Sequence, residues 1–329
     1  MTTLVTGASG HLGAHVVRHL LAQGRAVRAL VRPTSNLQGL EGLDVELVRG
    51  DVLDRVSLLS ALHGCSAVYH LAAVVAGWAH DPAVIYKTAI DGTANMLQSV
   101  ANTSGIAHII YTSSVATVGL SSTPHDLRNE SHYNTRGFSH YAVAKTRAEQ
   151  LAKELAEQCR LPLVIVNPAI VLGPYDYRLT PATQAVVSYL KYRLPVYFDA
   201  GANIVHADDV ARGHLLAEQH GTIGERYILS GANLTLRELF DLLTELAGRP
   251  PPRIELGRRT LSVLGSGVEL VARLRGKPSG LTRARARSLV GQYAFYDASK
   301  AQQQLGYTAR PARDIVAAAV QWVRTQGWV

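Results

Sequence analysis

The stretch that decides the fold lies near the start of the chain and reads Thr6-Gly7-Ala8-Ser9-Gly10-His11-Leu12-Gly13. It follows the apolar pair Leu4-Val5 and opens a segment in which Leu12, Val16 and Leu20 recur at four-residue spacing. A strand, a glycine-rich turn and an amphipathic helix in this order let the backbone approach a diphosphate at a helix N-terminus. The turn therefore predicts dinucleotide binding.

Outward from this turn, short β-branched runs alternate with helical patterns through the first half of the chain. The runs that we interpret as buried parallel strands are residues 4–5, 27–31, 45–48, 67–71, 108–112 and 163–166. Repeated strand, helix and strand units give a parallel sheet with right-handed crossovers. The predicted fold class is α/β, a Rossmann-type doubly wound parallel sheet.

After Pro174 the alternation becomes less regular and tyrosines become frequent, which predicts a second, smaller substrate-binding domain. We expect a dinucleotide-binding domain of residues 1–172 plus about 203–230, and a substrate domain of about 173–202 plus 231–329. Within the latter, the polar run 230–235 precedes an apolar pattern that predicts a capped amphipathic helix. A last helix is expected at about 312–324.

Composition excludes several classes of protein. The chain has 329 residues, 47% hydrophobic and 18% charged, which is unlike a disordered or fibrous chain. Its two cysteines, Cys65 and Cys159, cannot form a disulfide framework or a zinc site. The N-terminus has no signal-peptide or transmembrane pattern, so a cytoplasmic location is expected.

The net charge of +8 is concentrated in residues 253–288, where nine Lys or Arg stand against two Glu. A solvated face explains such a stretch, and an anionic partner is the alternative. The apolar residues between 261 and 274 are too few to span a bilayer, yet they can form a helix that roofs the substrate cleft. We expect no nucleic-acid partner and no stable membrane insertion, but a transient contact with a membrane surface and a homodimer are both compatible with this sequence.

The end of the second predicted strand indicates which nucleotide is bound. An acidic residue there would bind the ribose hydroxyls of NAD, but none occurs before Glu41. Arg32 directly follows the strand, and Ser35 is close by. Because a guanidinium forms charge-assisted hydrogen bonds with phosphate, we predict NADP(H) as the preferred cofactor, with NAD(H) as the alternative.

Catalytic chemistry is indicated by Tyr141 and Lys145, which lie four residues apart in a helical run. A lysine ammonium near a phenol lowers the tyrosine pKa and makes the phenol a usable acid or base. Upstream, the strand at 108–112 ends in Ser113-Ser114, at the sheet edge where doubly wound folds bind ligands. The sequence leaves open which of these two serines takes part.

Together these motifs resemble the extended short-chain dehydrogenases/reductases, also called the NAD-dependent epimerase/dehydratase family. The resemblance covers nearly the whole chain, and the dihydroflavonol 4-reductase-like branch with its hopanoid-associated sugar epimerase relatives is the most similar. The motifs that carry it are the glycine turn, Gly50-Asp51-Val52, His70-Leu71-Ala72-Ala73, Tyr111-Thr112-Ser113-Ser114, Tyr141-x-x-x-Lys145 and residues 167–174.

The resemblance implies a role for each matched position. Tyr141 would be the acid/base, Lys145 would hold the nicotinamide ribose, and Ser114 would hydrogen-bond the substrate oxygen. The cofactor-binding residues would be Gly7, Ser9, Gly10, His11, Leu12, Gly13, Arg32, Ser35, Asp51, Val52, Leu71, Ala72, Ala73, Thr112, Tyr141, Lys145, Pro168, Ile170 and Val171.

Three departures from the family pattern matter. Ala89 stands where many members have an active-site asparagine, and Asn167 stands where many have an arginine before the proline. The arginine of sugar-nucleotide enzymes is also absent around Asn203. The last two changes argue against a substrate that carries a diphosphate.

His206-Ala207-Asp208-Asp209 is not predicted to bind a metal, because an aspartate at the start of the helical run 210–218 is an ordinary N-cap and no third ligand is evident. The leading function is an NADP(H)-dependent oxidoreductase that reduces a ketone or aldehyde of a small, largely apolar substrate. The alternatives are a nucleotide-sugar epimerase or dehydratase with tightly held NAD, and a noncatalytic dinucleotide sensor.

Overall fold

The computed structural model describes residues 2–74, 81–137, 139–192, 196–248, 251–274 and 290–329. Its main element is a seven-stranded sheet in the order β10-β6-β5-β4-β1-β2-β3, and every neighbouring pair is parallel. The strands are β1 (Thr2–Thr6), β2 (Ala26–Val31), β3 (Glu46–Arg49), β4 (Cys65–His70), β5 (His108–Thr112), β6 (Leu163–Pro168) and β10 (Arg226–Leu229). The predicted doubly wound α/β fold is confirmed.

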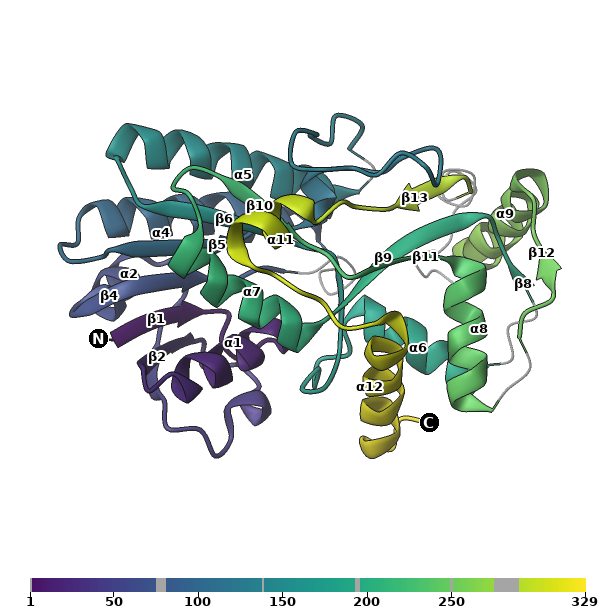
Figure 1. Cartoon of the computed structure of the whole chain (residues 1–329), viewed down its shortest axis with the longest axis horizontal. Helices are drawn as coiled ribbons and strands as arrows, with labels where there is room; N and C mark the ends of the chain where they lie inside the picture. The colour runs from purple at the N-terminus through teal and green to yellow at the C-terminus, as the bar shows by residue number, and fades with distance from the viewer. Residues whose placement is uncertain (1, 75–80, 138, 193–195, 249–250, 275–289) are drawn as a thin grey trace.

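Helices cover both faces of this sheet, as Figure 1 shows. One face carries α1 (His11–Ala22) and α7 (Ala207–His220), which pack on each other, and α11 (Ser299–Leu305) lies against α7 and β10. The other face carries α2 (Arg55–Leu62), α4 (Gly92–Ala101) and α5 (His140–Cys159). Shorter pieces are η1 (Gln38–Leu40), α3 (Pro82–Tyr86), η2 (Lys87–Asp91) and η3 (Val115–Thr117). Each face has its own buried apolar cluster.

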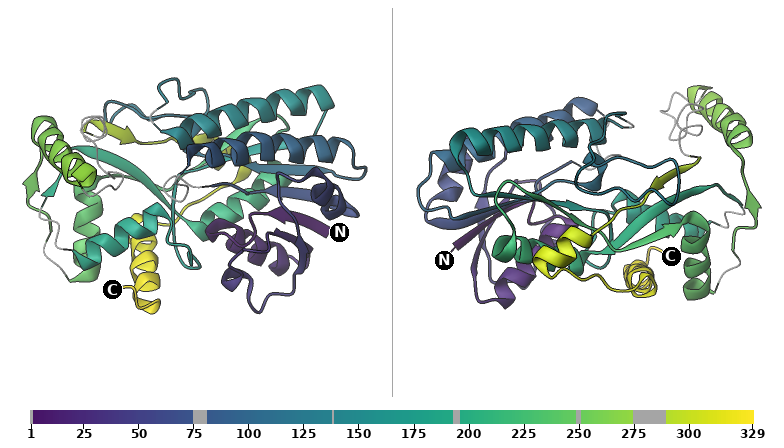
Figure 2. Two further views of the ribbon diagram at one scale, coloured as in Figure 1. Left: turned by 180° about the vertical axis from the view of Figure 1, so that it is seen from behind. Right: turned by 45° about the horizontal axis from the view of Figure 1, so that its top comes forward.

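A second, smaller sheet lies at the end of the molecule away from the N-terminus (Figures 1 and 2). It consists of β7 (Ile170–Leu172), β9 (Ala200–His206), β11 (Ala232–Thr235) and β13 (Gln292–Ala294), with β9 pairing to the other three. A separate pair is formed by β8 (Val196–Tyr197) and β12 (Ile254–Glu255). The helices here are α6 (Pro181–Lys191), α8 (Leu236–Ala247), α9 (Arg258–Leu274) and α12 (Ala312–Thr325). The expected helix at about 312–324 is therefore present.

Local sequence explains where two of these helices begin. Thr235 caps α8 with its hydroxyl, and the Glu238 carboxylate returns to the Thr235 N–H, so the predicted cap is a complete capping box. For α7 the prediction of an aspartate N-cap is wrong. His206 is the N-cap, and its Nδ1 accepts a hydrogen bond from the Asp208 N–H, because Asp208 and Asp209 already lie in the first helical turn.

The chain passes between the two sheets more than once. It leaves the main sheet after Pro168, enters the second sheet at Ile170, and returns through α7 after His206. The division at 172 and near 203 remains a prediction about domains. No helix among the described residues is long and apolar enough to cross a membrane.

Candidate active site

The glycine turn after β1 is tightly closed. The Gly10 N–H donates to the Gly7 oxygen at 2.9 Å, and Gly7 has a φ of 70°, a conformation that favours glycine. A Cβ on Gly7 would lie 2.8 Å from the Ala72 nitrogen, and one on Gly13 would lie 2.1 Å from the Gly7 oxygen. Side chains at either position would force the turn apart, so both glycines are required by its shape.

The helix that follows this turn presents a surface suited to phosphate. Gly10 is the N-cap of α1, and among the described residues no side chain caps its first N–H groups. The first turn of α1 also contains no acidic residue. Ser9, just before the helix, and Leu12, in its first turn, are only half-buried. Uncapped N–H groups and the positive end of the helix dipole bind diphosphates in such turns. These residues therefore fit the dinucleotide that the sequence predicted.

Leu71 and Ala72, which the resemblance assigns together with Ala73 to the cofactor, lie beside the turn. The Leu71 N–H donates to the Thr6 oxygen at 3.1 Å, and the Ala72 N–H donates to the Thr6 hydroxyl at 3.2 Å. His70 Nδ1 lies 2.8 Å from the same hydroxyl. Burial lowers the pKa of His70 to about 3, so the ring is neutral and serves to hold the end of β1 to the end of β4.

A pocket of about 510 Å³ opens beyond the ends of β2 and β3. We name it the arginine pocket, and its lining residues are Arg32, Pro33, Thr34, Arg49, Gly50, Asp51, Asp54 and Ser57. Arg32 and Asp51 were predicted for this site, whereas Arg49 was not. The Ser35 hydroxyl accepts a hydrogen bond from the Arg32 N–H at 3.0 Å, so Ser35 shapes the turn that carries Arg32. Val52 is buried against Gly92.

Tyr141 and Lys145 lie in the first two turns of α5. The Ser139 hydroxyl caps this helix by accepting from the Ala142 N–H at 3.1 Å, which starts the helix just before Tyr141. Lys145 is 3% exposed, and its Nζ donates to the Thr112 carbonyl oxygen at 2.9 Å. The Thr112 hydroxyl bonds instead to His214 Nε2 at 2.8 Å, so Thr112 serves this site through its backbone.

Burial controls the protonation of the Tyr141 and Lys145 side chains. It lowers the pKa of Lys145 to about 8, against the raising effect of Glu149. It raises the pKa of Tyr141, and a hydrogen bond with Ser114 opposes that rise. The expectation that Lys145 lowers the pKa of Tyr141 is wrong for the protein's own groups, because burial of the phenol outweighs the stabilisation of a phenolate. The phenol is protonated at neutral pH.

The two serines after β5 differ in their surroundings. Ser114 is half-buried, interacts with Tyr141, and accepts a hydrogen bond from the Ala116 N–H at 3.1 Å as the N-cap of η3. The Ser113 hydroxyl is buried and has no hydrogen-bond partner among the described residues, while its N–H continues the ladder to Val166. The geometry favours Ser114 as the partner of Tyr141.

A group of buried polar side chains lies beneath these residues, and we name it the Glu149 network: Thr117, Glu149, Asn167 and Arg226. The Asn167 Nδ2 donates to the Glu149 Oε2 at 2.7 Å and lies 3.1 Å from the Ser114 carbonyl oxygen. The Thr117 hydroxyl also bonds to Glu149, at 2.9 Å, and Arg226 forms a buried ion pair with it. The asparagine that departs from the family pattern is therefore a structural member of this network.

Pro168, Ile170 and Val171 lie where the chain passes from β6 to β7. The Ala169 N–H between them donates to the Leu229 oxygen at 3.2 Å, which extends the ladder toward β10. Ile170 is 38% exposed, so this predicted nicotinamide flank is accessible at the junction of the two sheets.

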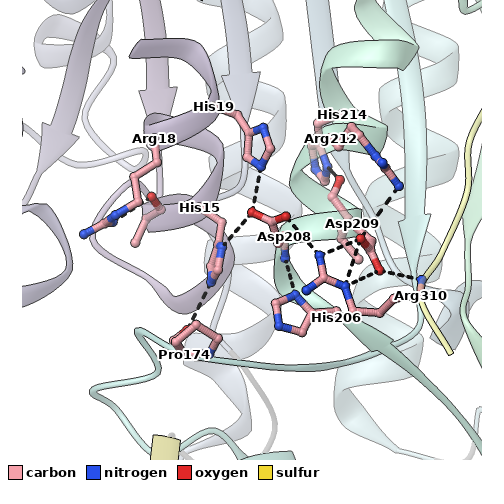
Figure 3. Close-up of polar contacts among 12 residues, drawn as sticks. His15, Arg18, His19, Pro174, His206, Asp208, Asp209, Arg212, His214 and Arg310 are labelled. Atoms are coloured by element: carbon pink, nitrogen blue, oxygen red, sulfur yellow. Dashed lines mark hydrogen bonds and ion pairs between the residues drawn. The ribbon is translucent and has the colours of Figure 1, made fainter. Parts of the chain in front are cut away.

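The sequence motif at 206–209 belongs to a cluster of charged side chains between α1 and α7 (Figure 3). The Asp208 carboxylate lies 2.8 Å from His19 Nε2 and 3.7 Å from His15 Nδ1, and these contacts hold its pKa well below the usual range. Arg310 forms ion pairs with both Asp208 and Asp209. Among the described residues, no three His, Cys, Asp or Glu side chains gather as a metal site would require.

Sequence reasoning missed Arg49, Glu149 and Arg226. Arg49 precedes Gly50-Asp51 directly, and the pairing of Val31 with Arg49 puts it beside the end of β2. Glu149 is one helical turn beyond Lys145, which is a signal that the sequence does contain. Arg226 carried no comparable signal, because its partner is 77 residues away.

Comparison with known proteins identifies the family. The profile of the NAD dependent epimerase/dehydratase family matches residues 3–230. The chain belongs to this family. It is therefore an NAD(P)-dependent enzyme of the extended short-chain dehydrogenase/reductase type, and its ligands are a nucleotide cofactor and a small-molecule substrate.

Several relatives are similar over most of their length. Sterol demethylase protein B of Methylococcus capsulatus is 34% identical, with all of both chains covered. Cinnamoyl-CoA reductase 1 of Oryza sativa is 34% identical over 75% of this chain and 76% of its own. The crystal structure of gox2253 superposes with a TM-score of 0.89 at 38% identity, covering 100% of this chain and 99% of the other.

Proposed function

We propose that this protein is an NADP(H)-dependent oxidoreductase that reduces a ketone or aldehyde of a small, largely apolar substrate. The observation that carries the proposal is the pairing of Tyr141 with the Ser114 hydroxyl, with Lys145 one helical turn away on the same face of α5. These three groups lie at the carboxyl edge of the sheet, on the same edge as the glycine turn. Doubly wound folds bind their ligands there.

The chemistry follows from what each group can donate. A nicotinamide nucleotide held at the glycine turn would supply a hydride for the carbonyl carbon, and the carbonyl oxygen would then need a proton. Tyr141 is protonated at neutral pH and gives its phenolic proton to that oxygen. The Ser114 hydroxyl donates a hydrogen bond to the same oxygen, and Lys145, fixed by the Thr112 carbonyl, stabilises the resulting phenolate.

Two features support NADP(H) over NAD(H). Arg32 and Arg49 both line the arginine pocket, where the adenosine ribose of the cofactor would lie. Asp51 lines it too, but its Oδ1 accepts from the Leu53 N–H at 3.0 Å. A guanidinium offers a phosphate charge-assisted hydrogen bonds, and it offers a bare ribose hydroxyl much less.

Two observations support an apolar substrate: the names of several relatives, and Asn167 at the position where many family members have an arginine. Relatives of 32–34% identity are named cinnamoyl-CoA reductase, tetraketide alpha-pyrone reductase and sterol demethylase protein B. Asn167 is 0% exposed and committed to Glu149, so it cannot bind a substrate diphosphate. The alternative, a nucleotide-sugar epimerase, is represented by a structure of lower identity, 26%, that of a nucleoside-diphosphate-sugar epimerase from Pseudomonas aeruginosa.

The decisive experiment uses Tyr141→Phe with a panel of aromatic and polycyclic ketones and aldehydes, following NADPH consumption. General acid catalysis contributes roughly 100- to 10,000-fold, so turnover should fall by that factor while NADPH binding is retained. Ser114→Ala should lower turnover, and Ser113→Ala is its matched control.

Two outcomes would contradict the proposal. A loss below tenfold in Tyr141→Phe would exclude Tyr141 as the proton donor. A purified protein that carries NAD and does not exchange it, with no consumption of added NADPH by any carbonyl compound, would favour the epimerase or dehydratase alternative.

A further inference from the structure

Glu149 lies in the middle of α5 and is completely buried. It is 0% exposed, and it follows Lys145 by four residues, so both side chains lie on one face of the helix. Lys145 is itself 3% exposed, and its Nζ donates to the Thr112 carbonyl oxygen at 2.9 Å. Because little water separates two buried groups, a carboxylate one helical turn away stabilises the charged form of the ammonium.

Three side chains from other elements hold the Glu149 carboxylate. The Asn167 Nδ2 of β6 donates to its Oε2 at 2.7 Å, and the Thr117 hydroxyl of η3 lies 2.9 Å from the same oxygen. Arg226 of β10 forms an ion pair with Oε1. Donors therefore face both oxygens, as a buried carboxylate requires. The fold sets both the position and the charge of Glu149.

The Ser114 backbone is fixed by two of the same side chains. Its carbonyl oxygen lies 2.9 Å from the Thr117 hydroxyl and 3.1 Å from Asn167 Nδ2. A hydroxyl has one hydrogen and an amide has two, so the Asn167 amide can donate to Glu149 and to Ser114 at the same time. The Ser114 hydroxyl interacts with Tyr141. The direction of that hydroxyl therefore depends on how the Ser114 carbonyl is held.

The remaining titratable groups that face Lys145 are neutral or exposed. The neutral groups are the phenols of Tyr111 and Tyr141 and the ring of His70, whose pKa burial lowers to about 3. The exposed groups are Lys87 and Asp91 of η2, which packs on α5. Water screens exposed charges. Among the described residues, Glu149 is therefore the buried charge that acts on Lys145, and its ion pair with Arg226 moderates that attraction.

We propose that Glu149 is a positioning residue of the active site. Its carboxylate stabilises the ammonium of Lys145, and Asn167 carries its position to the Ser114 carbonyl. This inference rests on the proposed function, in which these groups serve Tyr141. Once Tyr141 has given up its proton, the phenolate needs the positive charge of Lys145 beside it. One buried carboxylate thus supports both partners of the phenol.

The first test measures the charge of Lys145 directly, in the full chain without added nucleotide. Isotopically labelled lysine gives a side-chain NMR signal for each ammonium, and Lys145→Arg identifies the signal of Lys145. Burial lowers the pKa of Lys145 to about 8, and Glu149 opposes this change. In Glu149→Gln, which keeps the shape but loses the charge, the titration of Lys145 should move to lower pH. Glu154→Gln, exposed on the same helix, is the matched control and should leave it unchanged.

The second test follows NADPH consumption against pH, with the carbonyl compound on which the wild type is most active. Loss of the Lys145 proton removes the charge that stabilises the phenolate, so kcat falls at alkaline pH. In Glu149→Gln this fall should begin at lower pH, so kcat should drop at least about threefold near about pH 8 and less near about pH 6. A merely structural change would lower kcat by the same factor at every pH, and that result would overturn the inference.

A double-mutant cycle tests the path through Asn167. Asn167→Ala should lower kcat about three- to tenfold in the wild-type background and less than about twofold in Ser114→Ala, because the hydroxyl that it positions is then absent. The Lys145 titration should stay close to that of the wild type, since Glu149 keeps its charge. Equal losses of kcat in the two backgrounds would overturn the role of Asn167.

Glu149→Gln leaves Arg226 buried without its carboxylate, so thermal unfolding is measured for each variant. If Glu149→Gln fails to fold, Glu149→Leu combined with Arg226→Met takes its place, and the Lys145 titration should again move to lower pH. An unchanged titration in the folded variant would overturn the inference. Turnover retained in Tyr141→Phe would instead refute the proposed function, and the titration of Lys145 would not depend on that result.

Discussion

Arginine is used in two different ways in the Glu149 network and in the arginine pocket. In the network, Arg226 is 3% exposed, pairs with Glu149, and donates to the backbone oxygens of Glu130 and His132. In the pocket, Arg32 and Arg49 are exposed, and among the described residues neither forms an ion pair, although Asp51 and Asp54 line the same pocket. A buried charge must find its partner within the chain, whereas an exposed charge can receive one from solution. The first arrangement supports the fold, and the second is ready for a ligand.

Removing the buried arginine should have the largest effect on stability. Arg226→Met leaves Glu149 buried without its cation, so the free energy of unfolding should fall by about 3–5 kcal/mol. Urea denaturation measures this, with Arg49→Met as the control, which should change by no more than about 0.5 kcal/mol. Equal losses in the two variants would erase the distinction between the regions.

A double variant sharpens the same point. Glu149→Leu combined with Arg226→Met replaces the ion pair by apolar side chains, so part of the lost stability should return. A double variant that is less stable than either single variant would mean that the network contributes more than a compensated charge pair.

Acid should lower the free energy of unfolding through buried histidines such as His214, which bonds to Thr112. Burial lowers the pKa of His214 from 6.5 to about 4, so between these pH values the unfolded chain binds more protons than the folded chain. The free energy of unfolding should therefore fall as the pH falls through this window, by about 3 kcal/mol from this histidine. His214→Gln should make the dependence less steep but not remove it, because His11, His70 and His206 also have pKa values lowered by burial. His220→Gln, exposed on the same helix, should leave the slope unchanged.

Removing Arg32 should have a smaller effect, and it should change nucleotide binding and not the free energy of unfolding. Arg32→Ala should weaken NADPH binding by about 1.5–3 kcal/mol and leave NADH nearly unchanged, because one charge-assisted contact is lost. Titration of both nucleotides checks this, and denaturation should give the wild-type free energy. A loss of stability together with NADPH affinity would place Arg32 with the structural arginines.

The smallest effect is expected at the basic surface around α9, away from both the Glu149 network and the arginine pocket. Arg258 and Arg259, in the first turn of α9, are exposed, and Val263 of the same helix is 71% exposed. Arg253 is exposed as well, and residues 275–288 of the predicted basic stretch lie outside the described residues. Weak cosedimentation with anionic vesicles should fade as the Debye length falls from about 10 Å at 0.1 M salt to about 3 Å at 1 M. Zwitterionic vesicles are the control, and no binding at low salt leaves this surface as a solvated face.

Much of the fold was predictable because its signals are local. The glycine turn, the β-branched runs and the Tyr141–Lys145 spacing are each complete within about ten residues, and each lies on the expected element. The strand at 108–112 and the helix at 312–324 were placed almost to the residue. Local patterns of this kind fix element type well because they reflect periodicity and capping.

The features of the candidate site that the sequence did not predict depend on burial and on contacts between distant parts of the chain. The structural role of Asn167 depends on Glu149 and Ser114, which lie 18 and 53 residues away in the chain. The N-cap of α7 was missed because His206 is an uncommon cap. The pKa of Tyr141 was misjudged because spacing along a helix carries no information about burial.

The ion pairs of Arg310 bear on how this protein is made. The Asp208 carboxylate, which faces His15 and His19 of α1, is shared with Arg310, 102 residues later in the chain. During synthesis, Asp208 and Asp209 emerge about a hundred residues before that partner. The charge pairing of the glycine-turn helix α1 and α7 is therefore complete only when Arg310 has been synthesised and has reached Asp208 and Asp209.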